Sequence, residues 1–292
     1  MKNLHHFSIK NKINFESNLD LFKSKLSYNC FFIDNNKIVL FNRKDFFLQF
    51  KNLEDLKIKK ENLYFLGKKG KTLYLGAAVS LYKLKKLYNE QTFSLLSLRN
   101  CIDLVNQEQI SLLSYLYYLD RWKRENKFCS RCGAKNKFKN IKNFLECKDK
   151  NCKKKIFPKI DPTVIILIKY NNRILLARNS NWKQDLYSCI AGFCEPNESL
   201  EETVIRETYE EVGLKLKNIK YLFSQFWPFA NNLMVGFEAI SCSEKLKINK
   251  SEIEDAIWVT KKELLSLKRN KKIILPKKFA IAHSLITHWQ KS

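Results

Sequence analysis

Apolar residues in the first part of the chain occur in short runs that are separated by Asn and Gly turns. The runs "NCFFIDNNKIVLF" (29–41) and "KTLYLGAA" (71–78) have the length and composition of β-strands. A longer stretch, "QEQISLLSYLYYLDRWKREN" (107–126), has apolar residues at helical spacing and predicts an amphipathic helix. We therefore expect residues 1–125 to form a mixed α/β domain, in which we find no obvious catalytic motif.

Strand patterns return in the second half of the chain. The stretch "DPTVIILIKYNNRILLAR" (161–178) predicts a β-hairpin that turns at Asn171 and Asn172. The stretch "YSCIAGFCEP" (187–196) predicts a strand that enters a loop. These strands provide the sheet for the helix that follows.

A helix is predicted directly after this loop. Ser199 and Glu202 have the spacing of a capping box, and Gly213 suits a helix C-terminus. Apolar residues recur between them at helical spacing. We expect a helix from about Leu200 to Val212.

Three carboxylates lie on one face of this predicted helix. Glu207, Glu210 and Glu211 stand at i, i+3 and i+4, and like charges at this spacing repel. Arg206 is the one cation within the helix, and we expect it to balance at most one of them. A divalent cation would relieve the repulsion, and hard carboxylate oxygens suit Mg²⁺ or Mn²⁺. A solvated acidic face is the alternative.

Four of the nine cysteines occur in two close pairs. Cys129 and Cys132 are followed, after fourteen residues, by Cys147 and Cys152. This spacing predicts a closed tetrahedral Zn²⁺ site of structural type, with a longer second knuckle. Buried free cysteine is the alternative. The remaining cysteines show no such pairing and are expected to be ordinary core or surface residues: Cys30, Cys101, Cys189, Cys194 and Cys242.

Length and composition set bounds on the protein. The 292 residues, 45% of them hydrophobic, suffice for two domains with cores. No apolar run approaches the ~20 residues of a membrane span, and the N-terminus "MKNLHHFSIKNK" lacks a continuous apolar segment. The odd number of cysteines, without a secretory context, argues against a disulfide framework. We expect a cytoplasmic protein without a membrane partner.

The net charge of +25 indicates either an affinity for polyanions or a composition rich in lysine throughout the chain. Lysines are spread widely, which favours the second interpretation. The denser runs "KDKNCKKK" (148–155) and "LKRNKK" (267–272) remain candidates for contact with phosphate.

The segment 192–214 resembles the Nudix box. The matching positions are Gly192, Glu198, Arg206, Glu207, Glu210, Glu211 and Gly213, followed by Leu214. Thr208 departs from the pattern, because the family usually has an aliphatic residue there. We expect Thr208 to face packing and not metal. Nudix enzymes hydrolyse nucleoside diphosphates linked to another group, and the helix glutamates hold the metal.

A more specific resemblance runs from about Arg99 to Trp289. The four cysteines, "FPKIDPTVIILI", the box and "SQFWPFANNLM" are similar to the NADH pyrophosphatase family, the NudC-like Nudix hydrolases. Phe226 and Ala230 replace two of the family's prolines, and Asn232 stands where serine is common. The resemblance implies a Nudix α/β/α sandwich (an α/β or α+β fold) behind an N-terminal mixed α/β domain and a zinc ribbon. The implied domains are residues 1–125, 126–157 and 158–292.

The resemblance also implies the site residues. The implied catalytic residues are Glu198, Arg206, Glu207, Glu210 and Glu211. The implied Mg²⁺ or Mn²⁺ ligands are Glu207, Glu210, Glu211, Glu252 of "SEIEDAIW" and the backbone carbonyl of Ala191. The implied substrate contacts are Arg99, Phe157, Gln225, Phe226, Trp227, Pro228, Phe229, Ala230, Asn231, Asn232 and Ala282. Phe157 can stack a base, with core packing as the alternative. For His283 and His288 we favour packing or solvent over metal.

The implied reaction is hydrolysis of NAD(H) to NMN(H) and AMP, in which one of Glu207, Glu210 and Glu211 is the general base. Removal of the NAD cap from RNA 5′ ends is the alternative. A non-catalytic, zinc-ribbon nucleic-acid-binding regulator is the alternative from another class; it is disfavoured because degenerate boxes lose glutamates first. Similar proteins are homodimers, so we expect a homodimer.

Overall fold

The computed structural model describes residues 26–139 and 142–292. The N-terminal residues in which no signal segment was expected lie outside the described part, as does the start of the predicted N-terminal domain. The described chain falls into two compact units, one ending at Lys159 and the other beginning at Ile160. The predicted ribbon lies in the first unit. Its separation from residues 26–125 as a domain of its own stays a prediction.

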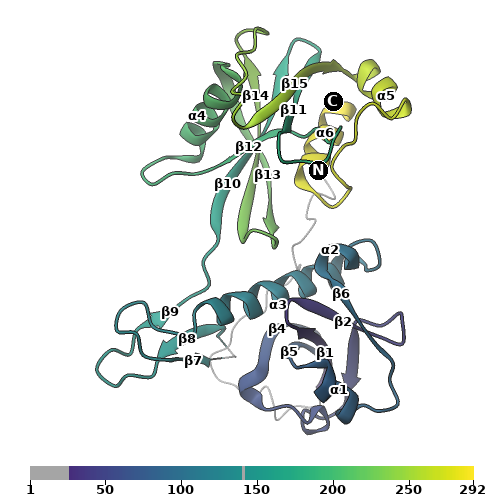
Figure 1. The fold of residues 1–292 in the computed structure, drawn as a ribbon, viewed down its shortest axis with the longest axis vertical. Helices are drawn as coiled ribbons and strands as arrows, with labels where there is room; N and C mark the ends of the chain where they lie inside the picture. Colours follow the sequence, from purple (N-terminus) through teal and green to yellow (C-terminus); the bar gives the residue numbers. More distant parts are fainter. Residues whose placement is uncertain (1–25, 140–141) are drawn as a thin grey trace. The chain divides into compact units, whose positions relative to one another are not determined.

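The first unit is built on a six-stranded sheet of order β4-β5-β1-β2-β6, with β3 paired to β1 (Figure 1). Its strands and short helices are β1 (Ser27–Asp34), β2 (Lys37–Phe41), β3 (Phe47–Phe50), β4 (Leu63–Lys69), β5 (Thr72–Ala78), α1 (Leu81–Leu87), β6 (Phe93–Ser97) and α2 (Leu98–Cys101), with 3-10 turns at Glu54–Leu56 and Lys60–Asn62. The strand patterns at 29–41 and 71–78 are thereby confirmed.

The long helix α3 (Gln107–Glu125) covers this sheet against β4, β1 and β5. It begins at Asn106, which forms a capping box with Gln109. Asp120 of α3 is buried, and it accepts hydrogen bonds from the Tyr64 hydroxyl at 2.9 Å and from Arg124 Nε at 2.9 Å. The predicted amphipathic helix is confirmed.

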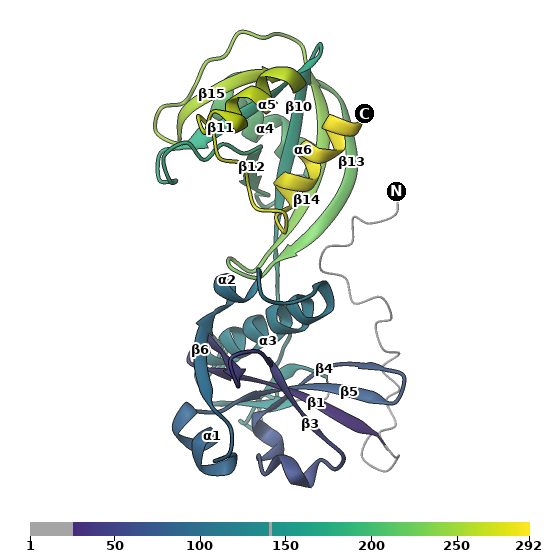
Figure 2. The same ribbon diagram turned by 90° about the vertical axis from the view of Figure 1, so that its right-hand side faces the viewer.

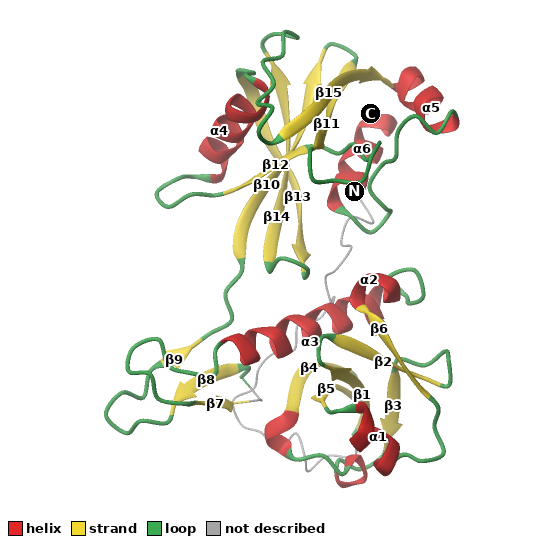
Figure 3. Cartoon of the chain, viewed as in Figure 1, coloured by secondary structure: helices red, strands yellow, loops and turns green. Residues whose placement is uncertain are grey.

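A small three-stranded antiparallel sheet follows α3 (Figure 3). It consists of β7 (Asn136–Lys139), β8 (Phe144–Cys147) and β9 (Lys155–Ile156). Cys129 and Cys132 lie in the loop before β7, Cys147 is the last residue of β8, and Cys152 lies in the loop between β8 and β9.

The second unit contains a six-stranded sheet of order β13-β14-β10-β11-β15, with β12 paired to β10. Its elements are β10 (Asp161–Tyr170), β11 (Arg173–Asn179), β12 (Ile190–Phe193), α4 (Leu200–Val212), β13 (Leu216–Trp227), β14 (Asn232–Ser241), β15 (Ile253–Thr260), α5 (Lys261–Arg269) and α6 (Ile281–Lys291). The predicted hairpin is confirmed, because Tyr170 pairs with Arg173 across the two-residue turn.

Helices cover both faces of this sheet. Val164 and Ile166 of β10 pack with Val204 of α4 on one face, whereas alternate residues such as Ile165 pack with Leu285 of α6 on the other. Period-two alternation along β10 thus supplies two cores from one strand. The layers form the expected α/β/α sandwich, with α4 and α6 on opposite sides (Figures 1 and 2).

Within residues 26–139 and 142–292, no helix is both long and apolar enough to cross a membrane. All nine cysteines are free thiols.

Candidate functional site

Helix α4 carries the acidic cluster, and its ends are fixed by local hydrogen bonds. Ser199 Oγ accepts from the Glu202 backbone N–H at 3.2 Å, and Glu202 Oε2 accepts from the Ser199 backbone N–H at 2.7 Å. Gly213 ends the helix with φ of 71°, in the left-handed region that glycine adopts without strain. The helix bounds predicted from the sequence, Leu200 and Val212, are confirmed.

Glu211 is the most unusual group on this helix. It is 7% exposed, and its Oε2 has no hydrogen-bond partner within the described residues. Burial raises the pKa of its carboxyl to about 8, and the charges of Glu207, Glu252 and Glu210 add to the effect. Burial also raises the pKa of Glu207, whereas Arg206 opposes this shift. The helix therefore presents a buried carboxyl that lacks a positive partner.

Arg206 connects several carboxylates. Its Nη1 lies 3.0 Å from Glu207 Oε1 and 3.0 Å from Glu210 Oε2. Arg206 therefore contacts two of the helix glutamates, because the donors of its branched guanidinium point in several directions at once. Its single positive charge still offsets the charge of only one of them, as expected.

The same guanidinium holds the loop before the helix. Arg206 Nε donates to Glu198 Oε1 at 2.6 Å, and Nη2 donates to Glu198 Oε2 at 2.9 Å and to the Phe193 carbonyl at 2.8 Å. Hydrogen bonds from Arg206, from the Glu195 backbone N–H and from the Thr203 hydroxyl lower the pKa of Glu198 to about 2. Glu198 therefore uses its oxygens to fix the loop against α4.

Strand β12 lies beside the glutamates and explains the box glycine. A β-carbon on Gly192 would lie 1.8 Å from Cδ of Glu207, so only glycine leaves room for that carboxylate. The neighbouring Ala191 pairs with Ile165 of β10 and is partly buried. The strand thus brings the Ala191 backbone and the Glu207 side chain to the same end of the sheet.

Glu252 reaches this region from a later loop. The Asn249 backbone N–H donates to the Glu211 carbonyl at 2.9 Å, and the Glu252 backbone N–H donates to the Asn249 carbonyl at 3.2 Å. The loop is thereby tied to the C-terminal turn of α4. The Glu252 carboxylate is near enough to raise the pKa values of Glu207 and Glu211.

The donors at this site fit a divalent cation. Three further carboxylates, those of Glu207, Glu210 and Glu252, are near enough to act on the Glu211 carboxyl, and the buried Oε2 of Glu211 has no donor within the described chain. Such a buried oxygen is costly unless a cation or a proton neutralises it. Carboxylate oxygens and a backbone carbonyl are the ligand set that Mg²⁺ and Mn²⁺ take.

The four predicted cysteines come together in the ribbon. The Sγ atoms of Cys129, Cys132, Cys147 and Cys152 all lie within 4.8 Å of one another. Backbone N–H groups of Arg131 and Cys132 lower the pKa of Cys129 to about 6, which favours the thiolate that a metal binds. The site fits a zinc ribbon with four thiolate ligands and no open position.

Gln225 of β13 is buried, and both ends of its amide are used inside the second unit. Nε2 donates to the Phe279 carbonyl at 2.7 Å, and Oε1 accepts from the Ile281 backbone N–H at 2.7 Å. Trp227 stacks on Phe279 with ring centroids 5.5 Å apart and contacts Phe229 edge-on at 5.1 Å. These residues hold the segment that begins α6.

The other predicted substrate residues of this region surround the turn between β13 and β14. Asn231 has φ of 59°, and its carbonyl accepts from the Asp161 backbone N–H at 3.0 Å. The side-chain Oδ1 atoms of Asn231 and Asn232 are buried and have no partner within the described residues. The remaining predicted substrate residues of this segment are Phe226, Pro228 and Ala230, and of these three Ala230 is exposed.

Comparison with known proteins identifies the family. The NUDIX domain model matches residues 159–279. Nudix hydrolase 19, chloroplastic, of Arabidopsis thaliana is 37% identical over 164 residues, which are 54% of this chain and 37% of that protein. NAD-capped RNA hydrolase NudC of Pseudomonas aeruginosa (strain LESB58) is 32% identical over 201 residues, which are 69% of this chain and 72% of that protein. The chain belongs to the NudC-like Nudix hydrolases.

In a longer relative, a smaller share of the protein aligns with this chain. NAD-capped RNA hydrolase NUDT12 of Macaca fascicularis is 35% identical over 179 residues, which are 58% of this Nudix hydrolase and 39% of that protein. The chain thus spans well under half of NUDT12 and of the Arabidopsis protein.

Two predicted substrate residues lie in the first unit. Arg99 is exposed on α2, and Phe157 is exposed after β9, where its ring lies 5.5 Å from that of Phe144. Ala282 of the second unit is buried near the start of α6, so only its backbone is suited to a substrate contact. Their substrate roles in this Nudix hydrolase stay predictions.

The two histidines of α6 have separate partners. His283 Nδ1 lies 3.0 Å from the Pro276 carbonyl, and His288 Nε2 lies 4.0 Å from Glu238 Oε2. The interpretation of both as packing or solvent-facing residues is consistent with these contacts.

Sequence reasoning missed Phe193. Its side chain is 53% exposed directly after Gly192, and its carbonyl is held by Arg206. The sequence pattern places it in an apolar strand, because a phenylalanine beside core residues gives no sign that it points to solvent. An exposed ring at this position can contact a substrate base.

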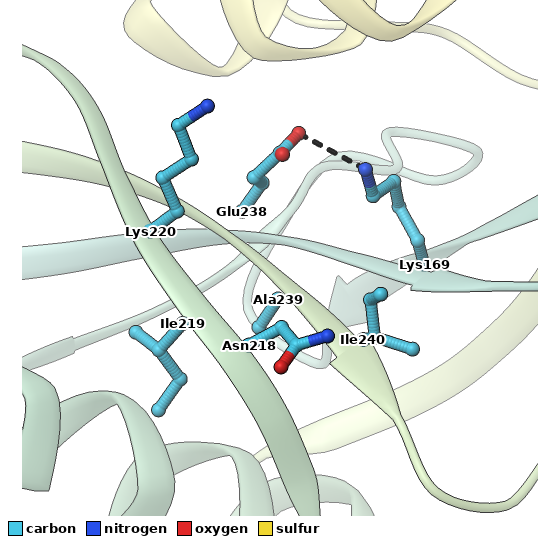
Figure 4. Close-up of a pocket in the computed structure, with 7 residues that line it drawn as sticks. All are labelled: Lys169, Asn218, Ile219, Lys220, Glu238, Ala239 and Ile240. Carbon is cyan, nitrogen blue, oxygen red and sulfur yellow. Dashed lines mark hydrogen bonds and ion pairs between the residues drawn. The ribbon is translucent and has the colours of Figure 1, made fainter.

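A cavity of about 300 Å³ lies elsewhere in the second unit, over β10, β13 and β14 (Figure 4). It contains none of the predicted site residues. Lys169 and Glu238 in its lining pair at 3.1 Å and neutralise one another, while Ile219 and Ile240 supply apolar surface. The glutamate site on α4 remains the candidate for catalysis.

Proposed function

We propose that this Nudix hydrolase cleaves the pyrophosphate of NAD(H) and releases NMN(H) and AMP. The observation that carries the proposal is the buried Glu211 carboxylate without a partner in the described chain, which is faced by Glu207 and Glu252 beside the box strand. A site with this excess of negative charge requires a cation, and a pyrophosphate shares the same cation. The likeness to NAD-capped RNA hydrolase NudC supports a dinucleotide as the substrate.

The catalytic cation is proposed to be Mg²⁺ or Mn²⁺, held by Glu207, Glu210, Glu211 and Glu252 with the carbonyl of Ala191. When bound, such an ion neutralises pyrophosphate oxygens and activates a water molecule. One of the three helix glutamates accepts the proton from that water.

Arg206 acts as a positioning residue in this proposal. Its contacts with Glu207 and Glu210 orient two ligand carboxylates, and its bonds to Glu198 and the Phe193 carbonyl hold the loop that borders the site. Glu198 acts through Arg206 and not on the substrate. One guanidinium therefore orders both the helix face and the loop.

The segment 225–232 is proposed to hold the substrate beyond the pyrophosphate. The buried Oδ1 atoms of Asn231 and Asn232 lack donors within the described chain, and a dinucleotide carries amide and amino N–H groups that can supply them. The Trp227 ring is stacked on Phe279 and contacts Phe229 edge-on, and the part of this half-buried indole that remains exposed is proposed to contact a base. Gln225 contributes by fixing the backbone around Phe279 and Ile281.

The ribbon is proposed to bind one structural Zn²⁺ through Cys129, Cys132, Cys147 and Cys152. We further propose a cytoplasmic homodimer. The four-thiol geometry supports the zinc. The dimer rests on the family resemblance, and the compartment rests on the odd number of cysteines, which argues against a disulfide framework.

Removal of the NAD cap from RNA is the second candidate. It is favoured by the names of the NudC and NUDT12 relatives, both of which are NAD-capped RNA hydrolases. The same glutamates and the same bond are involved, so the two candidates differ in what extends from the adenosine. A purely binding regulator is disfavoured, since such a protein has no use for a box with all its glutamates.

Mg²⁺-dependent release of AMP from NADH tests the proposal. Wild-type protein should produce AMP and NMNH in equal amounts, and Glu211→Gln should reduce kcat/KM by at least ~10²-fold because it removes a charge that stabilises the transition state. Glu201→Gln is the matched control: Glu201 is exposed on the first turn of the same helix and should leave turnover within about twofold. Absence of AMP release under Mg²⁺ and Mn²⁺, or equal rates for the two variants, would refute the proposal.

A further inference from the structure

Positive charge is concentrated in the ribbon. Residues 126–159, which are the ribbon and the two residues after it, contain twelve lysines and arginines and two acids, a net charge of +10 out of +25 for the whole chain. Residues 26–125 carry +7 and residues 160–292 carry +5. A lysine bias spread evenly would place about +3 in a segment of this length, so composition alone does not account for the ribbon. Four thiolates with one Zn²⁺ would still leave about +8.

The two acids of the ribbon are already engaged. Glu146 pairs with Lys139 at 2.9 Å. Asp149 Oδ1 accepts the backbone N–H groups of Asn151 at 2.8 Å and of Cys152 at 2.9 Å, which shapes the second knuckle. Glu146 also acts on its strand neighbours Lys137 and Lys155, but within the described residues neither carboxylate forms an ion pair with Lys148, Lys150 or Lys153.

Three lysines project from that knuckle. Lys148, Lys150 and Lys153 are exposed, and their ammonium groups make no ion pair within the described residues. They lie around Cys147 and Cys152, so the backbone that carries them is fixed by the thiol cluster. The knuckle thus presents three cations from a small, ordered loop.

The ribbon sheet has one apolar and one polar face. On the apolar face, Phe138 pairs with the buried Leu145 and its ring lies 5.2 Å from that of Tyr64 in the large sheet. This face is therefore covered by the first unit itself. The other face is turned away from that packing.

The polar face combines cations with aromatic rings. The pairing register places Lys137, Glu146 and Lys155 in one row across the three strands. Phe144 stands next to this row, 5.5 Å from the exposed ring of Phe157, and Lys155 Nζ lies 5.8 Å from the Phe144 ring centre. The exposed ring of Phe157 beside these lysines offers a stacking surface next to groups that can contact phosphate.

We propose that this surface binds the backbone of single-stranded RNA, with Lys148, Lys150 and Lys153 on phosphates and Phe157 beside the bases. We call Lys137, Lys148, Lys150, Lys153 and Lys155 with Phe157 the ribbon patch. The inference rests on the proposed function and deepens it, because it adds to the glutamate site a separate surface that holds the chain of an RNA substrate. Lysines alone would suffice to bind an acidic protein, whereas the exposed ring of Phe157 favours a partner with unpaired bases.

The test variant is Lys148→Gln, Lys150→Gln and Lys153→Gln combined in the full chain. Binding of an uncapped 15-nucleotide RNA should weaken at least tenfold at 50 mM salt. The slope of log affinity against log salt should fall in magnitude by about 2, at about 0.7 for each phosphate of a single strand that the variant no longer neutralises. The kcat/KM for an NAD-capped RNA should fall in proportion, and that for NADH should stay within about twofold.

The matched control removes the same charge elsewhere in the first unit. Lys83, Lys85 and Lys86 are exposed on α1, and their combined change to Gln should lower RNA affinity less than threefold. Equal losses in the two triple variants, or an unchanged RNA affinity in the knuckle variant, would overturn the proposal.

Two further readouts separate the possible causes. The first readout is zinc content, which should be equal in the wild type and in the knuckle variant. If the knuckle variant binds less zinc, the double variant Lys137→Gln and Lys155→Gln on the sheet face replaces it. The same loss of RNA affinity is expected for that double variant. The direct RNA-binding assay does not depend on turnover. A wild-type protein that binds RNA through the ribbon patch but releases no AMP from NADH would refute the proposed function and the use of RNA as a substrate, while RNA binding by the ribbon patch would stand.

Discussion

Replacing Glu211 by glutamine should make the metal-free protein more stable at neutral and alkaline pH, and should weaken the stabilisation of the protein by divalent metal. Glu211 has a pKa of about 8 against an ordinary value of 4.5. A carboxyl with a raised folded-state pKa contributes stability that is fully present below pH ~4.5 and is lost as the pH rises through ~8. Glutamine has nearly the same shape and no charge, so the difference between the two proteins isolates this effect.

The magnitude follows from the two pKa values. Each pKa unit corresponds to about 1.4 kcal/mol, so ionisable Glu211 destabilises the metal-free protein by about 1 kcal/mol at pH 5 and about 3 kcal/mol at pH 7. At pH 8.5 the figure is between about 4 and 5 kcal/mol. The pH 7 value corresponds to roughly 10 °C in the Tm of a unit of this size.

Thermal unfolding in EDTA at pH 5, 7 and 8.5 measures this difference. The Tm of wild type should fall progressively below that of Glu211→Gln as the pH rises, whereas Glu201→Gln should follow wild type. Addition of Mn²⁺ should then raise the Tm of wild type, because the ion binds the folded state, and should raise that of Glu211→Gln much less. Parallel pH profiles of wild type and Glu211→Gln would refute the reasoning that Glu211 carries a buried charge without a partner.

Four further changes test other parts of the structure. Gly192→Ala should lower kcat/KM at least tenfold in the AMP-release assay, because the new β-carbon would displace the carboxylate of Glu207, which lies 1.8 Å from it; normal turnover would contradict this close approach. Thr208→Val should raise the free energy of unfolding by about 1 kcal/mol in urea titration, since the Thr208 hydroxyl is buried and has no partner within the described residues; a loss of stability would contradict that. Gln225→Ala should destabilise the second unit by about 2–4 kcal/mol, because two backbone groups lose their buried partner; unchanged unfolding would mean that water replaces the amide. Cys132→Ser should reduce bound zinc, measured by metal analysis, from about one per chain to near zero; retained zinc would remove Cys132 from the ligand set.

The sequence by itself determined the features that depend on local spacing. The bounds of α4 follow from Ser199, Glu202 and Gly213, because capping and left-handed backbone are decided within a few residues. The alternation along 161–178 likewise predicted a hairpin, because a two-residue turn brings the two flanking strands directly beside each other. The cysteine spacing predicted a site whose thiols do converge.

The burial of Glu211 and the several bonds of Arg206 could not be read from spacing. They depend on β12 and on the loop of Asn249 and Glu252, which reach α4 from distant parts of the chain. A helical pattern shows which carboxylates share a face but not which of them is covered.

The tertiary structure likewise decided how the predicted substrate segment is used. The pattern "SQFWPF" marks Gln225 and Trp227 as candidates, but only the fold shows that both hold the segment around Phe279. Phe193 has the residue type of a core position, and is exposed because β12 ends beside the box loop. In each case the physical reason is the same: side-chain roles are set by contacts between segments far apart in sequence, and only packing brings those segments together.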